Sequence, residues 1–284
     1  MPKLFFIFLC LSLFCKAQQN EFDKYGPFGS QVHTDLKTAL EIEKNIYKMD
    51  LSYKKLEPKL YAKMGKLKDL QALKLSGNEI NTYPPDFGDL YNLLYFASYN
   101  NEFTSFPPDL KKLVNLNYIE FFGSKIDSVP SDIAYLNKLK TLKISSTNDT
   151  LKLPTTLKYL KNLKDVTIEN CVLDSFPKEI FKIPNLVFLN LTNTNTFYLT
   201  KHFERFINLE VLVLDANQLQ SIPYEIYLAK KLRFLSVKNN HLKKLPDSIS
   251  QLESLTVLDV RGNGFSKEYI EELKAMLPGC EIRF

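Results

Sequence analysis

LEVLVLDANQLQSIPYEIYLA, residues 209–229, contains the unit on which the whole chain is built. The same pattern of apolar residues, in general form LxxLxLxxNxLxxLPxxIxxL, returns every 23 or 24 residues from Leu70 onward. A fixed period of this length is the signature of a repeat protein, in which each unit packs only on its neighbours. The sequence therefore predicts one continuous array.

Nine copies align by the leucine that opens each one. These leucines are Leu70, Leu93, Leu116, Leu139, Leu163, Leu186, Leu209, Leu232 and Leu255. A degenerate leading copy around Ile46, Met49 and Leu51 brings the expected number of units to ten. Because the period hardly varies, equivalent residues of successive units should lie side by side.

Each unit begins with the alternation xLxLx, which predicts a short strand with one buried face. One such strand cannot close a core, but stacked parallel strands can cover one another. The second half of most units carries a proline, as at Pro84, Pro130 and Pro223. Since proline fixes φ and lacks an N–H, this half should return as irregular or short helical chain.

Over roughly residues 46–265, this pattern resembles the leucine-rich repeat family. The resemblance implies an α/β solenoid, or horseshoe, with parallel strands on the concave face and irregular or short helical segments on the convex face. It also implies that the small polar residue after each strand points inward and satisfies backbone groups of the turn, as any buried turn requires. These residues, expected to be structural, are Asn78, Asn101, Ser124, Thr147, Cys171, Thr194, Asn217, Asn240 and Asn263.

Residues 1–17 are predicted to be a signal peptide, with the apolar run LFFIFLCLSLFC and cleavage after Ala17. The run is too short to cross a bilayer, which needs about 20 residues. A lipid anchor on Cys15 is the less favoured alternative, because Phe14 is bulkier than the small residue that lipoprotein processing prefers. We therefore expect an exported protein that is periplasmic, on the cell surface or secreted. The Ala-Gln-Gln junction favours a bacterial origin.

The two ends of the array need caps, because their outward faces would otherwise be apolar. Residues 18–45 are expected to form an N-terminal helical cap, with Thr34 capping a helix that begins at Asp35. Residues 266–284 are expected to form a C-terminal cap, with Ser266 at the start of a helix and a closing strand after Gly279. The array itself spans 46–265.

Composition excludes several classes of function. The formal net charge is +5 at pH 7, and cleavage of the signal peptide would remove Lys3 and Lys16. The charges are scattered with no dense basic stripe, which argues against nucleic acid as a partner. No segment of the mature chain is apolar enough to span a membrane. Cys171 and Cys280 are four to five repeats apart, too far for a disulfide.

Catalytic and metal-binding patterns are lacking. His33, His202 and His241 show no metal-ligand spacing, and no phosphate loop, GxSxG or kinase signature occurs. Cys280 is best explained as an inward residue of the cap. The sequence therefore predicts no enzyme activity, no cofactor and no metal.

Outward residues beside the buried strand positions form columns along the concave face, and two concentrations of apolar side chains occur there. The first is the aromatic cluster Tyr95, Tyr99, Tyr118 and Phe122. The second comprises Phe188, Val211, Val213, Phe234 and Val257. Exposed aromatic patches favour a partner site. An apolar column that merely shields the sheet is the alternative, and the charges near the second patch should be solvated.

Two units depart from the pattern, around Asn148–Thr150 and between Thr194 and Thr200. Such irregularities can display a loop or be drift without function. Taken together, the sequence predicts a non-catalytic protein-binding module that recognises a macromolecular partner through its concave face. A cell-envelope or surface glycan-binding protein is the alternative, since tyrosines can stack on sugars.

Overall fold

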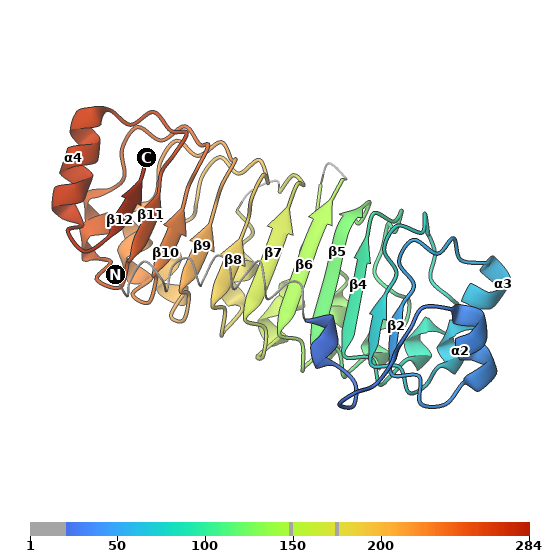
Figure 1. Ribbon diagram of the computed structural model, residues 1–284. Coiled ribbons are helices and arrows are strands. Elements are labelled where there is room, and N and C mark those ends of the chain that lie inside the picture. The colour runs from blue at the N-terminus through green and yellow to red at the C-terminus, as the bar shows by residue number, and fades with distance from the viewer. Residues whose placement is uncertain (1–20, 148–149, 174–175) are drawn as a thin grey trace.

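The computed structural model describes residues 21–147, 150–173 and 176–284, and the predicted signal peptide lies outside them. Within these residues, twelve parallel strands form one sheet whose order follows the chain from β1 to β12. Figure 1 shows the strands side by side, with the return segments behind them. The strands are β1 (Val32–His33), β2 (Lys48–Asp50), β3 (Ala72–Lys74), β4 (Tyr95–Tyr99), β5 (Tyr118–Ser124), β6 (Thr141–Ser146), β7 (Asp165–Glu169), β8 (Phe188–Asn190), β9 (Val211–Val213), β10 (Phe234–Ser236), β11 (Val257–Asp259) and β12 (Glu281–Arg283).

The return segments are short helices, mostly of the 3-10 type. The α-helices are α2 (Leu36–Ile42), α3 (Pro58–Tyr61) and α4 (Lys267–Met276). The 3-10 helices are η1 (Phe22–Lys24), η2 (Met64–Lys66), η3 (Phe87–Asp89), η4 (Leu110–Lys112), η5 (Ser131–Tyr135), η6 (Thr155–Tyr159), η7 (Ile180–Lys182), η8 (Phe203–Arg205), η9 (Tyr224–Leu228) and η10 (Asp247–Gln251). An extended proline precedes η5, η6, η9 and η10, which is the conformation that proline favours. The predicted fold class is confirmed.

Equivalent residues of successive repeats pair in register. Phe234 of β10 lies opposite Val211 of β9 on one side and Val257 of β11 on the other. The alternate residues Leu212 and Leu235 point into the core and are fully buried. Each outward position therefore forms a straight row across the concave face, as the fixed period predicts.

The turns after the strands are held by an asparagine ladder. The side-chain amide of Asn217 donates to the carbonyls of Leu191 (2.7 Å) and Leu214 (3.0 Å), and its oxygen accepts from the N–H groups of Thr194 and Thr196 (both 3.0 Å). Buried backbone groups of two neighbouring turns are thus paired by one side chain. Asn78, Asn101, Asn240 and Asn263 make corresponding bonds. Their structural role is confirmed.

Four of these ladder positions do not carry asparagine: Ser124, Thr147, Cys171 and Thr194. Cys171 is buried, but Thr147 is exposed, so the expectation that it points inward is wrong; the preceding Ser146 is buried instead and donates to the carbonyl of Ile126 (2.7 Å). Thr194 belongs to the irregular sixth unit, where its hydroxyl and that of Thr196 lie 2.9 Å apart, and both side chains are buried. The threonines therefore complete the turn of that unit. Ser124 is also buried, but its hydroxyl has no hydrogen-bond partner among the described residues. In the other irregular unit, residues 148 and 149 lie outside the described residues.

The N-terminal cap differs in detail from the expectation. Asp35, rather than Thr34, caps α2, because its carboxylate accepts a 2.7 Å hydrogen bond from the N–H of Thr38. The structure also adds the edge strand β1, which the sequence pattern did not indicate. Aspartate and threonine are both good N-caps, so the pattern could not place this boundary to within one residue.

At the other end, Ser266 caps α4 by accepting a hydrogen bond from the N–H of Tyr269. Leu273 is buried against the last repeat, and the Tyr269 hydroxyl donates to the carbonyl of Leu245 (3.1 Å). Strand β12 then pairs with β11. Helix and closing strand thus occur where the sequence predicts them, while the boundaries assigned to the four segments stay predictions.

Candidate functional site

The predicted aromatic residues come together on β4 and β5. Tyr95 stacks on Tyr118, with ring centroids 4.8 Å apart, and Tyr99 meets Phe122 edge-on at 5.8 Å. In-register pairing of the two strands produces both contacts. The structure therefore confirms that these four side chains form one cluster.

The expectation that all four rings are exposed is wrong for two of them. Tyr95 is only 3% exposed and Tyr118 only 4%. Phe22 of η1 packs edge-on against Tyr95 at 5.6 Å, and Tyr25 lies 5.4 Å from the same ring. The physical reason is that the chain's own N-terminal segment, here residues 21–30, crosses this part of the concave face (Figure 1). Tyr99 and Phe122 are half-buried.

Two lysines of the preceding repeats hold the N-terminal segment. The Lys48 ammonium donates to the carbonyl oxygen of Asp23 (2.9 Å), and the Lys74 ammonium lies 4.3 Å from the centroid of the Phe22 ring. Burial, and after it the nearby Glu21 carboxylate, raises the pKa of Tyr25 to about 12. The segment is therefore seated by apolar, cation–π and hydrogen-bond contacts together.

Between Tyr118 and Phe122, on the same face of β5, lies a buried carboxylate, Glu120, which is 3% exposed. It accepts hydrogen bonds from the hydroxyls of Tyr99 and Tyr118, both at 2.7 Å, and its other oxygen lies 3.8 Å from the Lys143 ammonium. Burial first, and then the Glu120 charge, raises the pKa of both tyrosines above the usual range. The hydroxyls therefore stay protonated and donate to the carboxylate.

The middle of the face is polar. Asp165 and Glu169 on β7 are partly buried, and burial raises the pKa of both carboxyls. Hydrogen bonds oppose this shift, from Thr141 to Asp165 (3.2 Å) and from Asn190 to Glu169. This polar zone separates the aromatic cluster from the second predicted patch.

The second patch forms a row across β8 to β11. Phe188, Val211 and Phe234 follow one another in register, with Val213 in the adjacent column, and all four are partly exposed. These four residues are called the apolar row below. Val257 continues the same column but is 1% exposed, so the expectation that it is accessible is wrong. Its in-register neighbours, Phe234 and Glu281, flank it on both sides.

The charges beside the apolar row are paired rather than merely solvated. Asp215 accepts hydrogen bonds from the Ser236 hydroxyl and from the N–H of Lys238 (2.9 Å), whose ammonium lies 3.0 Å from the same carboxylate. Asp259 is 2% exposed and is held by the Arg261 guanidinium through two contacts of 2.9 and 2.6 Å. The row is thus bordered by fixed ion pairs.

The described residues carry little that could serve catalysis. Nowhere among them do three or more His, Cys, Asp or Glu side chains gather in a way that could hold a metal ion. Cys171 and Cys280 are free thiols, and burial raises the pKa of each to about 12. A thiol with such a pKa is a poor nucleophile. The Nε2 atom of His241 lies at hydrogen-bond distance (2.8 Å) from the side-chain oxygen of Gln218.

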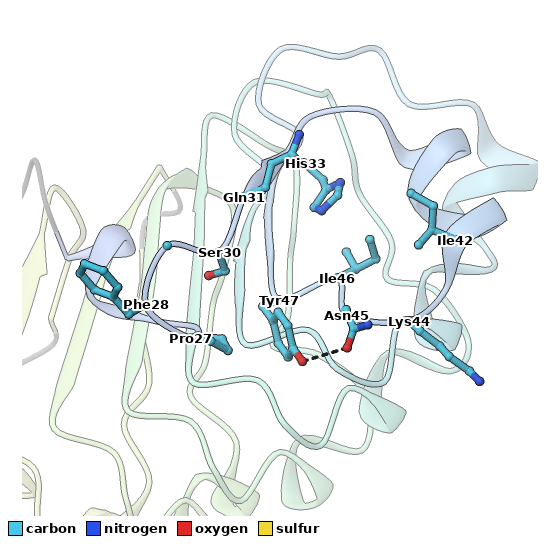
Figure 2. Close-up of a pocket in the computed structure, with 11 residues that line it drawn as sticks. Pro27, Phe28, Ser30, Gln31, His33, Ile42, Lys44, Asn45, Ile46 and Tyr47 are labelled. Carbon is cyan, nitrogen blue, oxygen red and sulfur yellow. Dashed lines mark hydrogen bonds between the residues drawn. The ribbon is translucent and has the colours of Figure 1, made fainter.

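A separate pocket of about 420 Å³ opens at the N-terminal edge of the array. Figure 2 shows Ser30, His33, Ile46 and Tyr47 among the side chains of this pocket, and the Tyr47 hydroxyl donates to Asn45 (3.0 Å). The pocket is open and its lining mixes loop and cap residues. It does not join the predicted site.

Phe22 and Tyr25 are the concave-face residues that the sequence pattern did not indicate. They lie outside the repeats, so the period places them nowhere. One signal could have indicated them, because Ala72 and Ala97 leave two outward positions small in the midst of aromatic side chains. Because proteins are closely packed, a hollow of this kind is expected to be filled by a side chain from elsewhere.

Comparison with known proteins agrees with the geometry. Residues 207–265 match the family model described as leucine rich repeat. Over 54 residues the chain is 44% identical to leucine-rich repeat-containing protein 7 of Rattus norvegicus, which covers 19% of this chain and 4% of that protein. The chain thus spans only a small part of the length of this relative.

Two solved structures share the fold at low identity. The Toll–Spätzle complex of Drosophila gives a TM-score of 0.69 at 22% identity, covering 82% of this chain and 32% of that chain. An internalin, InlF of Listeria monocytogenes, gives 0.63 at 17% identity, covering 84% and 74%. Among the described residues, no helix is long and apolar enough to cross a membrane. The fixed period, the parallel sheet with its asparagine ladder and the match over residues 207–265 together identify the chain as a leucine-rich repeat protein.

Proposed function

We propose that the chain is a non-catalytic protein-binding module that holds a macromolecular partner against the C-terminal half of its concave face. The observation that carries the proposal is the apolar row, in which Val211, Val213 and Phe234 stay partly exposed on rigid neighbouring strands. Apolar side chains arranged in this way on a preformed surface can bury area against a partner at small entropic cost. Tyr99, Phe122 and Phe188, the other predicted residues that are partly exposed, would extend the contact.

The border of the row suits a protein surface. Lys238 and Arg261 are both paired with buried or nearly buried aspartates, yet their side chains remain 34% and 53% exposed. Their cationic ends are therefore fixed in place and can still contact a partner. A central apolar patch with a polar, charged rim is the usual arrangement of a protein interface. The complex of Toll with Spätzle supports the proposal by analogy of fold alone.

We further propose that the protein is exported and bacterial, from the pattern of residues 1–17. Periplasmic, surface-bound and released forms are all compatible with that pattern. Mass spectrometry of the mature protein tests the proposal, because cleavage after Ala17 would leave Gln18 as the first residue. An intact Met1, or a lipid on Cys15, would contradict that cleavage.

Paired substitutions test the binding site. The variant Val211→Ser with Phe234→Ser removes the centre of the apolar row, and each partner captured by the native protein from envelope or culture fractions should bind it at least tenfold more weakly. The matched control is Tyr135→Ser with Tyr159→Ser, which removes two aromatic side chains that are 56% and 53% exposed on the return segments. The control should bind normally. Equal binding by the native protein and both variants would exclude the apolar row as the site.

The glycan alternative now depends on Tyr99, the one tyrosine of the cluster that stays partly exposed. It requires accessible tyrosines, and the other two, Tyr95 and Tyr118, are buried in one cluster with Phe22. Capture of a partner that survives deglycosylation would favour the protein-binding proposal over this alternative.

A further inference from the structure

A hollow on the outer face of β3, β4 and β5 is filled by an aromatic side chain from outside the repeats. Ala72 and Ala97 form its floor, and the stacked rings of Tyr95 and Tyr118 form its wall. These four residues are called the cradle below. Phe22 sits in it and is itself only 4% exposed, with Tyr25 packed alongside. The cradle is therefore complementary to an aromatic side chain.

The polar contacts around the cradle recognise backbone as well as side chain. Lys48 donates to the main-chain carbonyl of Asp23, and Lys74 faces the Phe22 ring. A carbonyl is present in any peptide, whereas the ring is not. The two lysines therefore select a short peptide turn with an aromatic residue at the right place.

The N-terminal segment is shaped to leave the cradle sharply after Tyr25. Gly26 has a φ of +83°, and a Cβ there would come within 2.8 Å of the Ser30 hydroxyl and 2.9 Å of Cε of Lys48. A side chain at this position would be strained and would press on the lysine that holds the segment. Glycine is thus required for the segment to fit as closely as it does.

The contacts of Phe22 and Tyr25 are separate from the main core. The buried residues of the array form one continuous cluster, and the cradle with its two covering rings forms another on the opposite face of the sheet. Removal of the N-terminal segment would uncover the cradle without opening the core. In this respect the N-terminal segment resembles a bound ligand more than a structural element of the array.

We propose that the cradle is a peptide-recognition site for a short segment with two aromatic residues three positions apart, and that Phe22 to Tyr25 is its resident intramolecular ligand. A partner with the same pattern binds there only by displacing the N-terminal segment. The site lies on other strands than the apolar row, so the inference goes beyond the proposed function and does not depend on it.

The experiment uses the full mature chain and a fluorescently labelled peptide of residues 21–30, EFDKYGPFGS. The double variant Phe22→Ala with Tyr25→Ala empties the cradle. It should bind the peptide at least tenfold more tightly than the native chain does, because in the native chain the tethered segment competes at an effective concentration in the millimolar range. Fluorescence polarisation up to about 1 mM peptide measures both affinities. The single variant Gly26→Ala, which only loosens the segment, should bind with intermediate affinity.

Adding Ala97→Leu to the double variant fills the floor of the cradle and supplies the control. Peptide binding should then be lost, while circular dichroism shows that the array is still folded. Equal binding by the native chain and the double variant, no binding by either, or binding that survives Ala97→Leu would each overturn the proposal. None of these results depends on the unidentified partner, so they leave the test of the apolar row unaffected.

Discussion

On β4 and β5 the outward rings of Tyr95 and Tyr118 are buried beside the chain's own N-terminal segment, whereas on β8 to β10 the outward apolar side chains are partly exposed. The scaffold beneath is the same, with in-register strands and an asparagine ladder in both halves. The difference comes from two alanines, Ala72 and Ala97, which make room for Phe22. Chemically similar rows of apolar side chains can therefore differ in solvent exposure within one solenoid.

Each half also contains a buried carboxylate on the concave face. Glu120 is held by two tyrosine hydroxyls, and Asp215 is held by a serine hydroxyl, a backbone N–H and the ammonium of Lys238. Aromatic rings surround the Glu120 carboxylate, whereas the Lys238 ammonium beside Asp215 stays partly exposed. The N-terminal half of the concave face thus contacts its own chain, while the C-terminal half carries the partner site that we propose.

The largest effects are expected where the two halves are alike. Asn101→Ala and Asn217→Ala each leave buried carbonyl and N–H groups of the turns unpaired, which should lower the free energy of unfolding by about 2–4 kcal/mol. Urea titration followed by circular dichroism measures both. A loss in only one variant, or two separate transitions, would show that the halves unfold independently.

The next effect should separate the halves. Phe22→Ala removes a ring that is almost fully buried, and should lower the free energy of unfolding by about 1.5–3 kcal/mol. Phe234→Ala removes a partly exposed ring, and should cost less than half as much. The same urea titration compares them. If the order is reversed, the N-terminal segment is not seated on the cradle in solution.

A smaller effect is expected from the hydroxyl network. Tyr118→Phe removes a hydrogen bond to the buried Glu120 carboxylate and should lower the free energy of unfolding by about 1–2 kcal/mol. The control is Tyr135→Phe on the exposed return segment, which should change stability by less than about 0.5 kcal/mol. Equal stabilities of the two variants would mean that the network does not form.

The smallest effect concerns alkaline pH. The folded-state pKa of Tyr25 is raised to about 12, above its usual value of 10.0, so its stabilising contribution is complete below pH 10 and is lost as the pH rises towards 12. The native chain should therefore lose more stability across this range than Tyr25→Phe does. Thermal unfolding at several pH values measures the difference. Parallel curves would show that Tyr25 titrates as an exposed tyrosine does.

Prediction from sequence succeeded where the repeat imposes a position. The buried leucines, the asparagine ladder, the rows Tyr95–Tyr118 and Val211–Phe234, and the cap at Ser266 all follow from a fixed period or a local motif. Accessibility was predicted less well. Parity shows that Tyr95 and Val257 face outward, but it carries no information about what covers them.

The sequence by itself determined the solenoid, its register and the side of the sheet on which each residue lies, because a 23-residue period and strand alternation are local rules repeated along the chain. Only the tertiary structure decided which outward residues meet solvent. Contact between Phe22 and Tyr95 joins segments more than 70 residues apart and depends on the shape of the hollow over Ala72 and Ala97. Complementarity of shape across such a distance is a property of the folded surface, and no local pattern encodes it.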